Sequence, residues 1–260
     1  MNISCLLHYS NLRTLKTGAH MEIPLILLVV IIAGGIGTMT GFGISTIMVP
    51  VMLLFYPVPE TLFFVGIIHF FGNVWKLVLF SKGLRWGLIL SFGIPGITAT
   101  YLGASLVFDI PAVVLSRVLG SFLILYVVYL FAKSSFKVKP SLFFGACGGA
   151  LSGFLAGVFG IGGAVRGLFL TAFDLPKAVY ISTAGAIALF IDATRLTTYF
   201  SKGARLPELL LYGLPLFIPA SFLAAAIAKR IVDRIPQEHF RKIVAVFLLL
   251  MGIKLLLLPA

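Results

Sequence analysis

Charged residues are scarce in this chain. Asp, Glu, Lys and Arg make up 11% of its 260 residues, and only 8 residues are acidic. Soluble domains carry roughly 25% charged residues, because these residues build a surface that faces water. The low charge therefore excludes a soluble globular protein. The 60% share of hydrophobic residues also excludes an intrinsically disordered chain.

Cysteine and recognisable catalytic motifs are also nearly absent. The two cysteines, Cys5 and Cys147, form neither a disulfide framework nor the paired spacing of a metal site. The chain has no HExxH helix, no GxSxG nucleophile elbow, no GxxxxGK[ST] phosphate loop and no pair of intramembrane carboxylates. We therefore expect no enzyme activity, no cofactor and no metal site. An intramembrane Ser or His hydrolase is the remaining enzymatic alternative.

Long apolar runs dominate what is present. The mean hydropathy is +1.12, and apolar runs recur from Ile23 to the C-terminus without the polar alternation of a transmembrane barrel. The pattern predicts an all-α integral membrane protein, a polytopic helical bundle. Ten helical segments are expected, at 23–40, 44–56, 59–80, 86–107, 111–132, 141–159, 163–173, 177–200, 206–228 and 237–258.

The second and seventh segments are too short to cross a bilayer comfortably. At a rise of about 1.5 Å per residue, roughly 12 helical residues cover about 18 Å of a hydrocarbon core of about 30 Å. Each follows a glycine-rich break, Gly41-Phe42-Gly43 in the first half and Gly160-Ile161-Gly162-Gly163 in the second. We expect a re-entrant or glycine-broken helix pair at each break.

The two halves repeat one another at offsets of 119 and 120 residues. FSKGLR at 80–85 recurs as FSKGAR at 200–205, and Asn73 corresponds to Asp192. Each half contains an odd number of crossings, which predicts inverted repeats, each a broken helix pair followed by three transmembrane helices. The expected units are a tail of residues 1–20, either unstructured or upstream of the true start at Met21, then repeat 1 at 21–132, a basic linker at 133–140 and repeat 2 at 141–260.

The net charge of +12 is carried mainly by short loops between the apolar segments. This arrangement is typical of the positive-inside rule and not of a nucleic-acid surface, so we expect a lipid bilayer and no nucleic acid as the partner. An orientation with both termini outside and the linker 133–140 inside places more Lys and Arg residues inside than the reverse orientation does. We therefore expect this orientation.

The glycine breaks are the first candidate site. Glycines in membrane helices commonly serve close packing, and that alternative applies to most of the 27 in this chain. Irregular backbone at membrane depth is tolerated where it lines a cavity, and free N–H groups at a helix start attract anions. We therefore expect an anion cradle with two hydroxyl donors from the first copy, formed by Gly41, Gly43, Ser45, Thr46, Gly160, Gly162 and Gly163.

Ionisable residues within the apolar segments are the second candidate group. His69, Asn73 and Lys76 fall on one face of a predicted helix, and Asp192 and Arg195 lie in the matching helix of the second half. Such residues are costly in a membrane and default to functional candidates. With Arg166, we expect Asn73, Lys76 and Arg195 to bind substrate, while Asp192 and His69 tune the charge or take a proton. The alternatives are a structural ion pair, a snorkelling lysine and a core histidine.

These motifs carry a resemblance to a known family. TGFGISTIMVP at 40–50, FGIGGAVRG at 159–167, HFFGNVWKLVLFSKG at 69–83 and DATRLTTYFSKG at 192–203 resemble the sulfite exporter TauE/SafE family. The resemblance implies a multi-pass transporter in the plasma membrane, the bacterial inner membrane, with the glycine motifs near the substrate. We expect transport of a small, sulfur-containing anion by alternating access, coupled to a proton or a sodium ion. An anion channel is the alternative.

Overall fold

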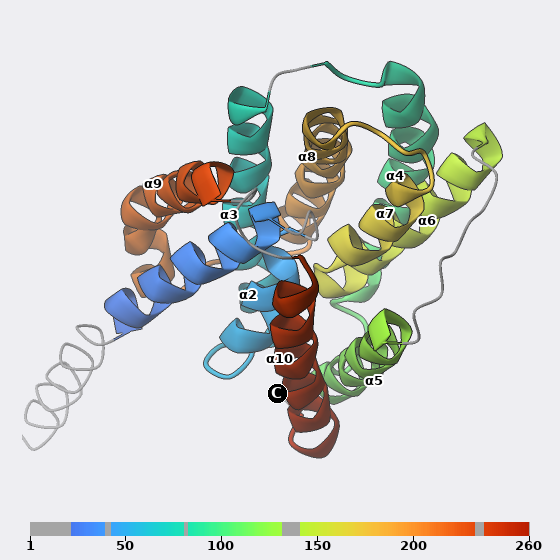
Figure 1. Cartoon of the computed structure of the whole chain (residues 1–260). Helices are drawn as coiled ribbons and strands as arrows, with labels where there is room; N and C mark the ends of the chain where they lie inside the picture. The colour runs from blue at the N-terminus through green and yellow to red at the C-terminus, as the bar shows by residue number, and fades with distance from the viewer. Residues whose placement is uncertain (1–21, 40–42, 81–82, 132–140, 232–236, 260) are drawn as a thin grey trace, which may run out of the picture.

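The fold is a bundle of helices, seen here in a computed structural model (Figure 1). The structure describes residues 22–39, 43–80, 83–131, 141–231 and 237–259. The predicted tail 1–20, Met21, Gly41 and the whole linker 133–140 lie outside these residues. The helices are Glu22–Met39, α2 (Ser45–Met52), α3 (Val58–Leu79), α4 (Trp86–Leu106), α5 (Ala112–Phe131), α6 (Leu142–Phe159), α7 (Gly162–Thr171), α8 (Lys177–Ser201), α9 (Glu208–Ile231) and α10 (Gln237–Leu257).

Six of these helices are long and apolar enough to cross a membrane, namely Glu22–Met39 and the spans within α3, α4, α6, α8 and α9. In contrast, α2 has 8 residues and α7 has 10, so they rise roughly 12 and 15 Å in a hydrocarbon core of about 30 Å. The described residues contain no strand. The predicted polytopic all-α membrane fold is thereby confirmed, with two short helices where two short segments were expected.

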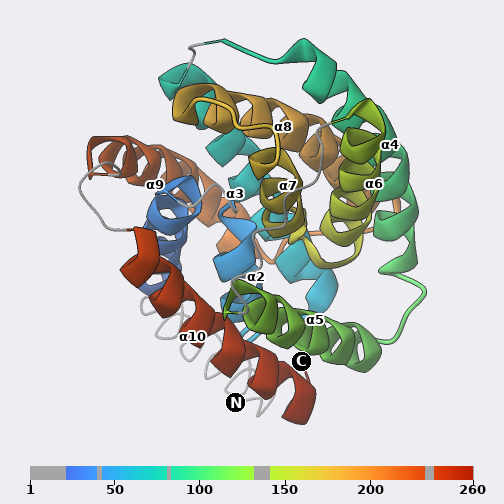
Figure 2. The same cartoon turned by 45° about the vertical axis from the view of Figure 1, so that its right-hand side comes forward.

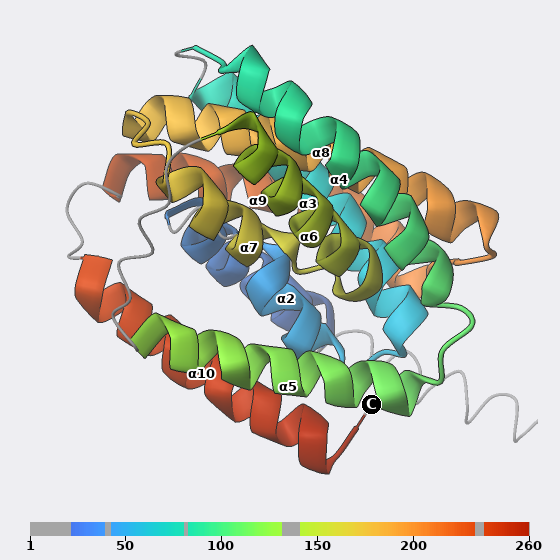
Figure 3. The same ribbon diagram turned by 90° about the vertical axis from the view of Figure 1, so that its right-hand side faces the viewer.

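A stripe of small residues joins α6 to α4. Gly149 faces Phe92, Gly153 faces Gly96, and a Cβ on Gly153 would lie 2.7 Å from the Gly96 Cα. The two contacts advance together along both helices, so α4 and α6 run parallel, as Figure 3 also shows. The Thr100 hydroxyl donates to the Gly153 carbonyl at 3.0 Å. Small residues at every fourth position thus allow the backbones to approach closely, as in other membrane helix pairs.

The chain reverses direction after α6. Gly160 takes the left-handed conformation with φ 73° and its N–H bonds to the Ala156 carbonyl, a helix end that favours glycine. Beyond it α7 folds back along α6, since Gly162 faces Ser152 and Gly148 faces Phe169. The second half therefore contains a glycine-broken helix pair whose second helix folds back along the first.

The first half has a corresponding break between Glu22–Met39 and α2. Gly43 has φ +87°, which side chains with a Cβ rarely adopt. Its N–H donates to the Gly37 carbonyl at 3.3 Å, so the two sides of the break touch.

Two antiparallel helix pairs complete the bundle. At its centre α3 crosses α8 (Figure 2), where Gly66 lies near Arg195 and Gly185 near Lys76. Along one side α5 packs on α10, and the closest approach joins Gly120 to Gly252. The α3–α8 pair is the element that positions the candidate site.

Candidate functional site

Five ionisable side chains are buried around the α3–α8 crossing. His69 and Lys76 come from α3, Asp192 and Arg195 from α8, and Arg166 from α7, each with 4% or less of its surface exposed. Asp192 is the only buried carboxylate among the described residues. Three cations therefore face one anion, which leaves an excess of positive charge in the interior.

Asp192 is surrounded by donors. Its Oδ1 pairs with the Arg195 Nε at 2.9 Å, and its Oδ2 lies 2.8 Å from the His69 Nδ1. The Asn73 side-chain amide donates to the same Oδ2 at 2.8 Å. A carboxylate that is paired with an arginine and accepts from an amide and an imidazole has the partners that a buried charge needs.

The glycine breaks lie against this charged cluster. A Cβ on Gly43 would collide with the His69 Nε2, and a Cβ on Gly160 would come within 2.9 Å of the Arg195 Nη1. Gly66 lies beside the same arginine, since its Cβ would be in ordinary contact with the Arg195 Cζ at 3.6 Å. Gly43 and Gly160 thus leave room for the bulky side chains at the crossing.

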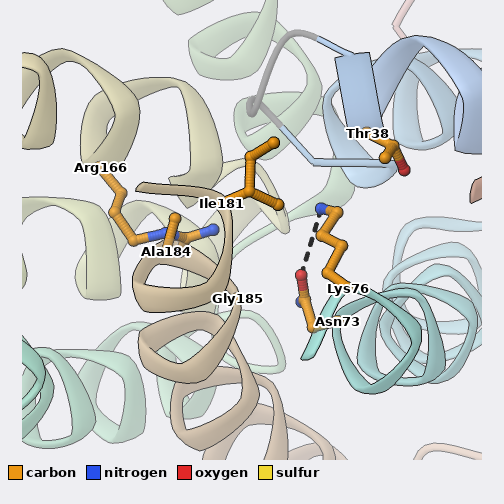
Figure 4. Close-up of a pocket in the computed structure, with 7 residues that line it drawn as sticks. All are labelled: Thr38, Asn73, Lys76, Arg166, Ile181, Ala184 and Gly185. Atoms are coloured by element: carbon orange, nitrogen blue, oxygen red, sulfur yellow. Dashed lines mark hydrogen bonds between the residues drawn. The ribbon is translucent and has the colours of Figure 1, made fainter. Parts of the chain in front are cut away.

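A small cavity adjoins the cluster. Arg166 reaches it from α7 and Lys76 from α3, with Ile181 and Ala184 of α8 between them (Figure 4). Thr38 from the helix Glu22–Met39 also lines it. The cavity is lined by Thr38, Asn73, Lys76, Arg166, Ile181, Ala184 and Gly185.

Unused donors face this region. The Arg166 Nε and the Thr38 hydroxyl are buried and have no hydrogen-bond partner among the described residues. Lys76 donates to the Asn73 Oδ1 at 3.3 Å, which uses one of its three ammonium protons. A small anion in the cavity would supply the acceptors that these donors lack.

Asn73 connects the cavity to the charged cluster. Its Oδ1 accepts from Lys76 at the cavity, while its Nδ2 donates to Asp192 in the cluster. The two ends of one amide therefore contact two neighbouring sites.

The structure brings together most, though not all, of the residues predicted from the sequence. Asn73, Lys76 and Arg166 line the cavity, and His69, Asp192 and Arg195 form the adjoining cluster. Other predicted cradle residues lie elsewhere: Gly162 faces the Ser152 backbone, and Ser45, Thr46 and Gly163 are buried without lining the cavity. Gly41 is outside the described residues.

Two residues near the site were not predicted. Thr38 is one of two threonines at the end of an apolar run, three residues before Gly41, and only this proximity to the break could have indicated it. Tyr199 lies one helical turn after Arg195 and donates to the Gly157 carbonyl, which ties α8 to α6. Among the described residues, no group of three His, Cys, Asp or Glu side chains could hold a metal ion.

Comparison with known proteins agrees with this architecture. The pattern of the sulfite exporter TauE/SafE family matches residues 26–255. A protein of Methanocaldococcus jannaschii named as a probable membrane transporter is 24% identical over 265 residues, covering 90% of this chain and 96% of the relative. The family match spans the helices, both glycine breaks and the buried charges, so the chain belongs to the sulfite exporter TauE/SafE family and is a multi-pass membrane transporter.

Proposed function

We propose that this transporter moves a small, sulfite-like anion through the cavity between Lys76 and Arg166. The observation that carries the proposal is the excess of buried positive charge among the described residues, which lies beside a small cavity. An unpaired charge in a membrane interior is costly, and Arg166 has no carboxylate partner in a salt bridge among the described residues. An anion bound there would offset this cost, which favours anionic over neutral or cationic substrates.

The donor set favours an oxyanion. Lys76, Arg166 and Thr38 offer ammonium, guanidinium and hydroxyl hydrogens, and guanidinium groups match oxyanions well because their donors are planar and fixed. Ile181 and Ala184 add apolar walls to the same lining, so its chemistry matches a compact ion that carries several oxygens. Sulfite and small sulfonates have this chemistry.

Alternating access is the transport mode that the helix arrangement supports. We infer that the two halves are inverted repeats, since α3 and α8 are matching helices of the two halves and cross antiparallel beside the cavity. Transporters built from such repeats bind substrate at the repeat interface and rock one part against another. An anion channel is the alternative, and it could not accumulate an anion against its gradient.

Binding by purified protein tests the anion site. Calorimetry with sulfite, methanesulfonate and chloride should show binding of the oxyanions. Lys76→Met and Arg166→Met should each weaken binding by about tenfold or more, because a hydrogen bond to a charged group contributes about 1.5–3 kcal/mol. Lys202→Met is the matched control, since this lysine is exposed at the end of α8. Unchanged affinity in both cavity variants would contradict the proposal.

Transport in proteoliposomes separates the two mechanisms. A transporter that alternates access should exchange labelled for unlabelled sulfite and accumulate it when a driving gradient is imposed. Passive equilibration alone would identify a channel.

A further inference from the structure

The two ring nitrogens of His69 have different surroundings. Nδ1 lies 2.8 Å from an Asp192 carboxylate oxygen, so it carries a hydrogen that this oxygen accepts. Nε2 is buried, has no partner among the described residues and faces Gly43. In the neutral ring, the free lone pair is therefore on Nε2, at the first glycine break.

Protonation of Asp192 itself is unfavourable. Both its oxygens are already engaged: Oδ1 forms the ion pair with Arg195, while Oδ2 accepts from Asn73 and His69. A proton on either oxygen would face another donor, and the ion pair with Arg195 would be lost. Asp192 therefore acts as a positioning residue, which orients the imidazole so that Nε2 remains open.

We propose that Nε2 of His69 is the binding site of a coupling proton that travels with the anion. The assignment rests on the anion transport proposed above. The Nε2 lone pair takes a proton from the solution on one side of the membrane, and the imidazolium keeps its Nδ1–H bond to Asp192. The same proton leaves on the other side once the anion has gone. No other bond forms or breaks.

The charges around His69 explain why the two ligands are coupled. Lys76 and Arg195 repel the positive charge that the ring gains when Nε2 takes a proton, and Asp192 attracts it. An anion between Lys76 and Arg166 offsets part of this positive field, so anion binding favours protonation of His69. By linkage, protonation must then strengthen anion binding by the same factor. The charged groups that act on the ring are Lys76 from α3 and Asp192 and Arg195 from α8. Arg166 from α7 and Tyr199 from α8 act on Asp192 in turn.

Asn73 provides a direct path between the two ligands. Its amide hydrogen bonds to Asp192, and its carbonyl accepts from Lys76. An anion in the cavity draws the Lys76 ammonium toward itself, which breaks the hydrogen bond from Lys76 to the Asn73 carbonyl. The hydrogen bonds of Asn73 and His69 to Asp192 then readjust. This makes the expected cycle cotransport of the anion and one proton in the same direction.

The experiment uses wild-type protein and one matched variant in proteoliposomes with a pH-sensitive dye inside. The anions are sulfite and methanesulfonate, the latter keeping its charge over the range from about pH 5 to 8 in which an unperturbed histidine titrates. The wild type should move protons inward with the anion and accumulate it under an inward proton gradient. His69→Asn retains an amide donor at the position of Nδ1 and removes the titrating nitrogen. It should exchange the anion at equilibrium but lose both proton movement and proton-driven accumulation.

Three results would overturn the assignment. Proton-driven accumulation that persists in His69→Asn removes His69 as the site. Accumulation in the wild type that follows a sodium gradient, or net anion uptake without proton movement, shows that no coupling proton is used. A second variant, His69→Gln, keeps the test available if the Asn variant does not fold, because its amide reaches the Nε2 position without titrating. If the wild type exchanges none of the anions, the proposed function itself fails and the proton site with it.

Discussion

Asn73 donates its side-chain amide to Asp192 across a distance of 2.8 Å, and the two residues are 119 positions apart. This separation equals the offset that aligns the two halves of the sequence. A residue in one half therefore touches its counterpart in the other. Such contacts occur where two related units meet at a two-fold axis.

A second, reciprocal pair of contacts surrounds the first. Gly66 lies against Arg195, and Gly185 lies against Lys76. At the same offset, Gly66 corresponds to Gly185 and Lys76 to Arg195. This reciprocity is the signature of a self-complementary interface, and it supports the proposal that α3 and α8 lie on either side of a pseudo-two-fold axis.

Asp192→Asn should strongly destabilise the protein. The change leaves Arg195 buried without its ion-pair partner, and breaking a buried pair in this way costs about 3–5 kcal/mol. The free energy of unfolding in detergent, measured with denaturant, gives the effect. Asp109→Asn is the control, because Asp109 is exposed and its change should stay within about 0.5 kcal/mol. Equal stability of the two variants would show that Asp192 has no structural role in holding the cations.

Much of the helical layout follows from hydropathy alone, because a membrane helix needs about 20 apolar residues. The predicted segment 177–200 is α8 at Lys177–Ser201, and 163–173 is α7 at Gly162–Thr171. The segment expected at 44–56 ends earlier, at Met52. Hydropathy cannot detect this end, because the apolar run continues through Leu53, Leu54 and Phe55.

The candidate site was only partly accessible from the sequence. The spacing of His69, Asn73 and Lys76 places them on one helix face, which a single helix can reveal. That this face meets Asp192 depends on how α3 crosses α8, and one sequence does not determine that crossing. The offset pairs Gly43 with Gly162, yet Gly43 faces His69 while Gly162 faces the α6 backbone. Glycines that look equivalent in the repeat thus have different neighbours.

Gly153→Ala should weaken the contact between α4 and α6. The added Cβ would meet the Gly96 backbone, which cannot move aside as a side chain can, and overpacking of this kind costs about 1–3 kcal/mol. Thermal unfolding in detergent measures the loss. Gly93→Ala on α4 is the matched control, because a Cβ there meets no atom within 4 Å. It should be neutral or stabilising by about 0.5–1 kcal/mol, since alanine favours a helix over glycine. Similar melting temperatures for both variants would mean that the close glycine contact is not needed.

Gly43→Ala should impair proton-driven uptake beyond its effect on stability. Its Cβ would press on the His69 Nε2, the nitrogen proposed to take the proton. Gly83→Ala is the control: both glycines have positive φ, at +87° and +94°, but the nearest atom to a Gly83 Cβ is a Val179 methyl at 3.9 Å. Both should lose about 1–2 kcal/mol of stability from backbone strain. Only Gly43→Ala should lower proton-driven sulfite uptake by about tenfold or more, which corresponds to about 1.4 kcal/mol. Equal uptake in the two variants would contradict crowding at His69.

The two copies of the FSKG sequence should lie on opposite sides of the membrane. α3 and α8 cross antiparallel, so the segments that follow their C-terminal ends leave the bundle at opposite ends. Arg85 and Lys202 are exposed in these segments, and the excess of loop cations favours Arg85 inside and Lys202 outside.

Single cysteines at these positions, in a chain with Cys5 and Cys147 changed to Ser, allow the test with a membrane-impermeant maleimide. Lys202→Cys should react in intact cells, and Arg85→Cys only in inside-out vesicles. Labelling of both from one side would contradict the antiparallel crossing of the two halves. Labelling from opposite sides, but with the sides exchanged, would agree with the inversion and reverse the orientation. The inversion depends on how α3 and α8 cross, whereas the orientation depends only on the distribution of Lys and Arg.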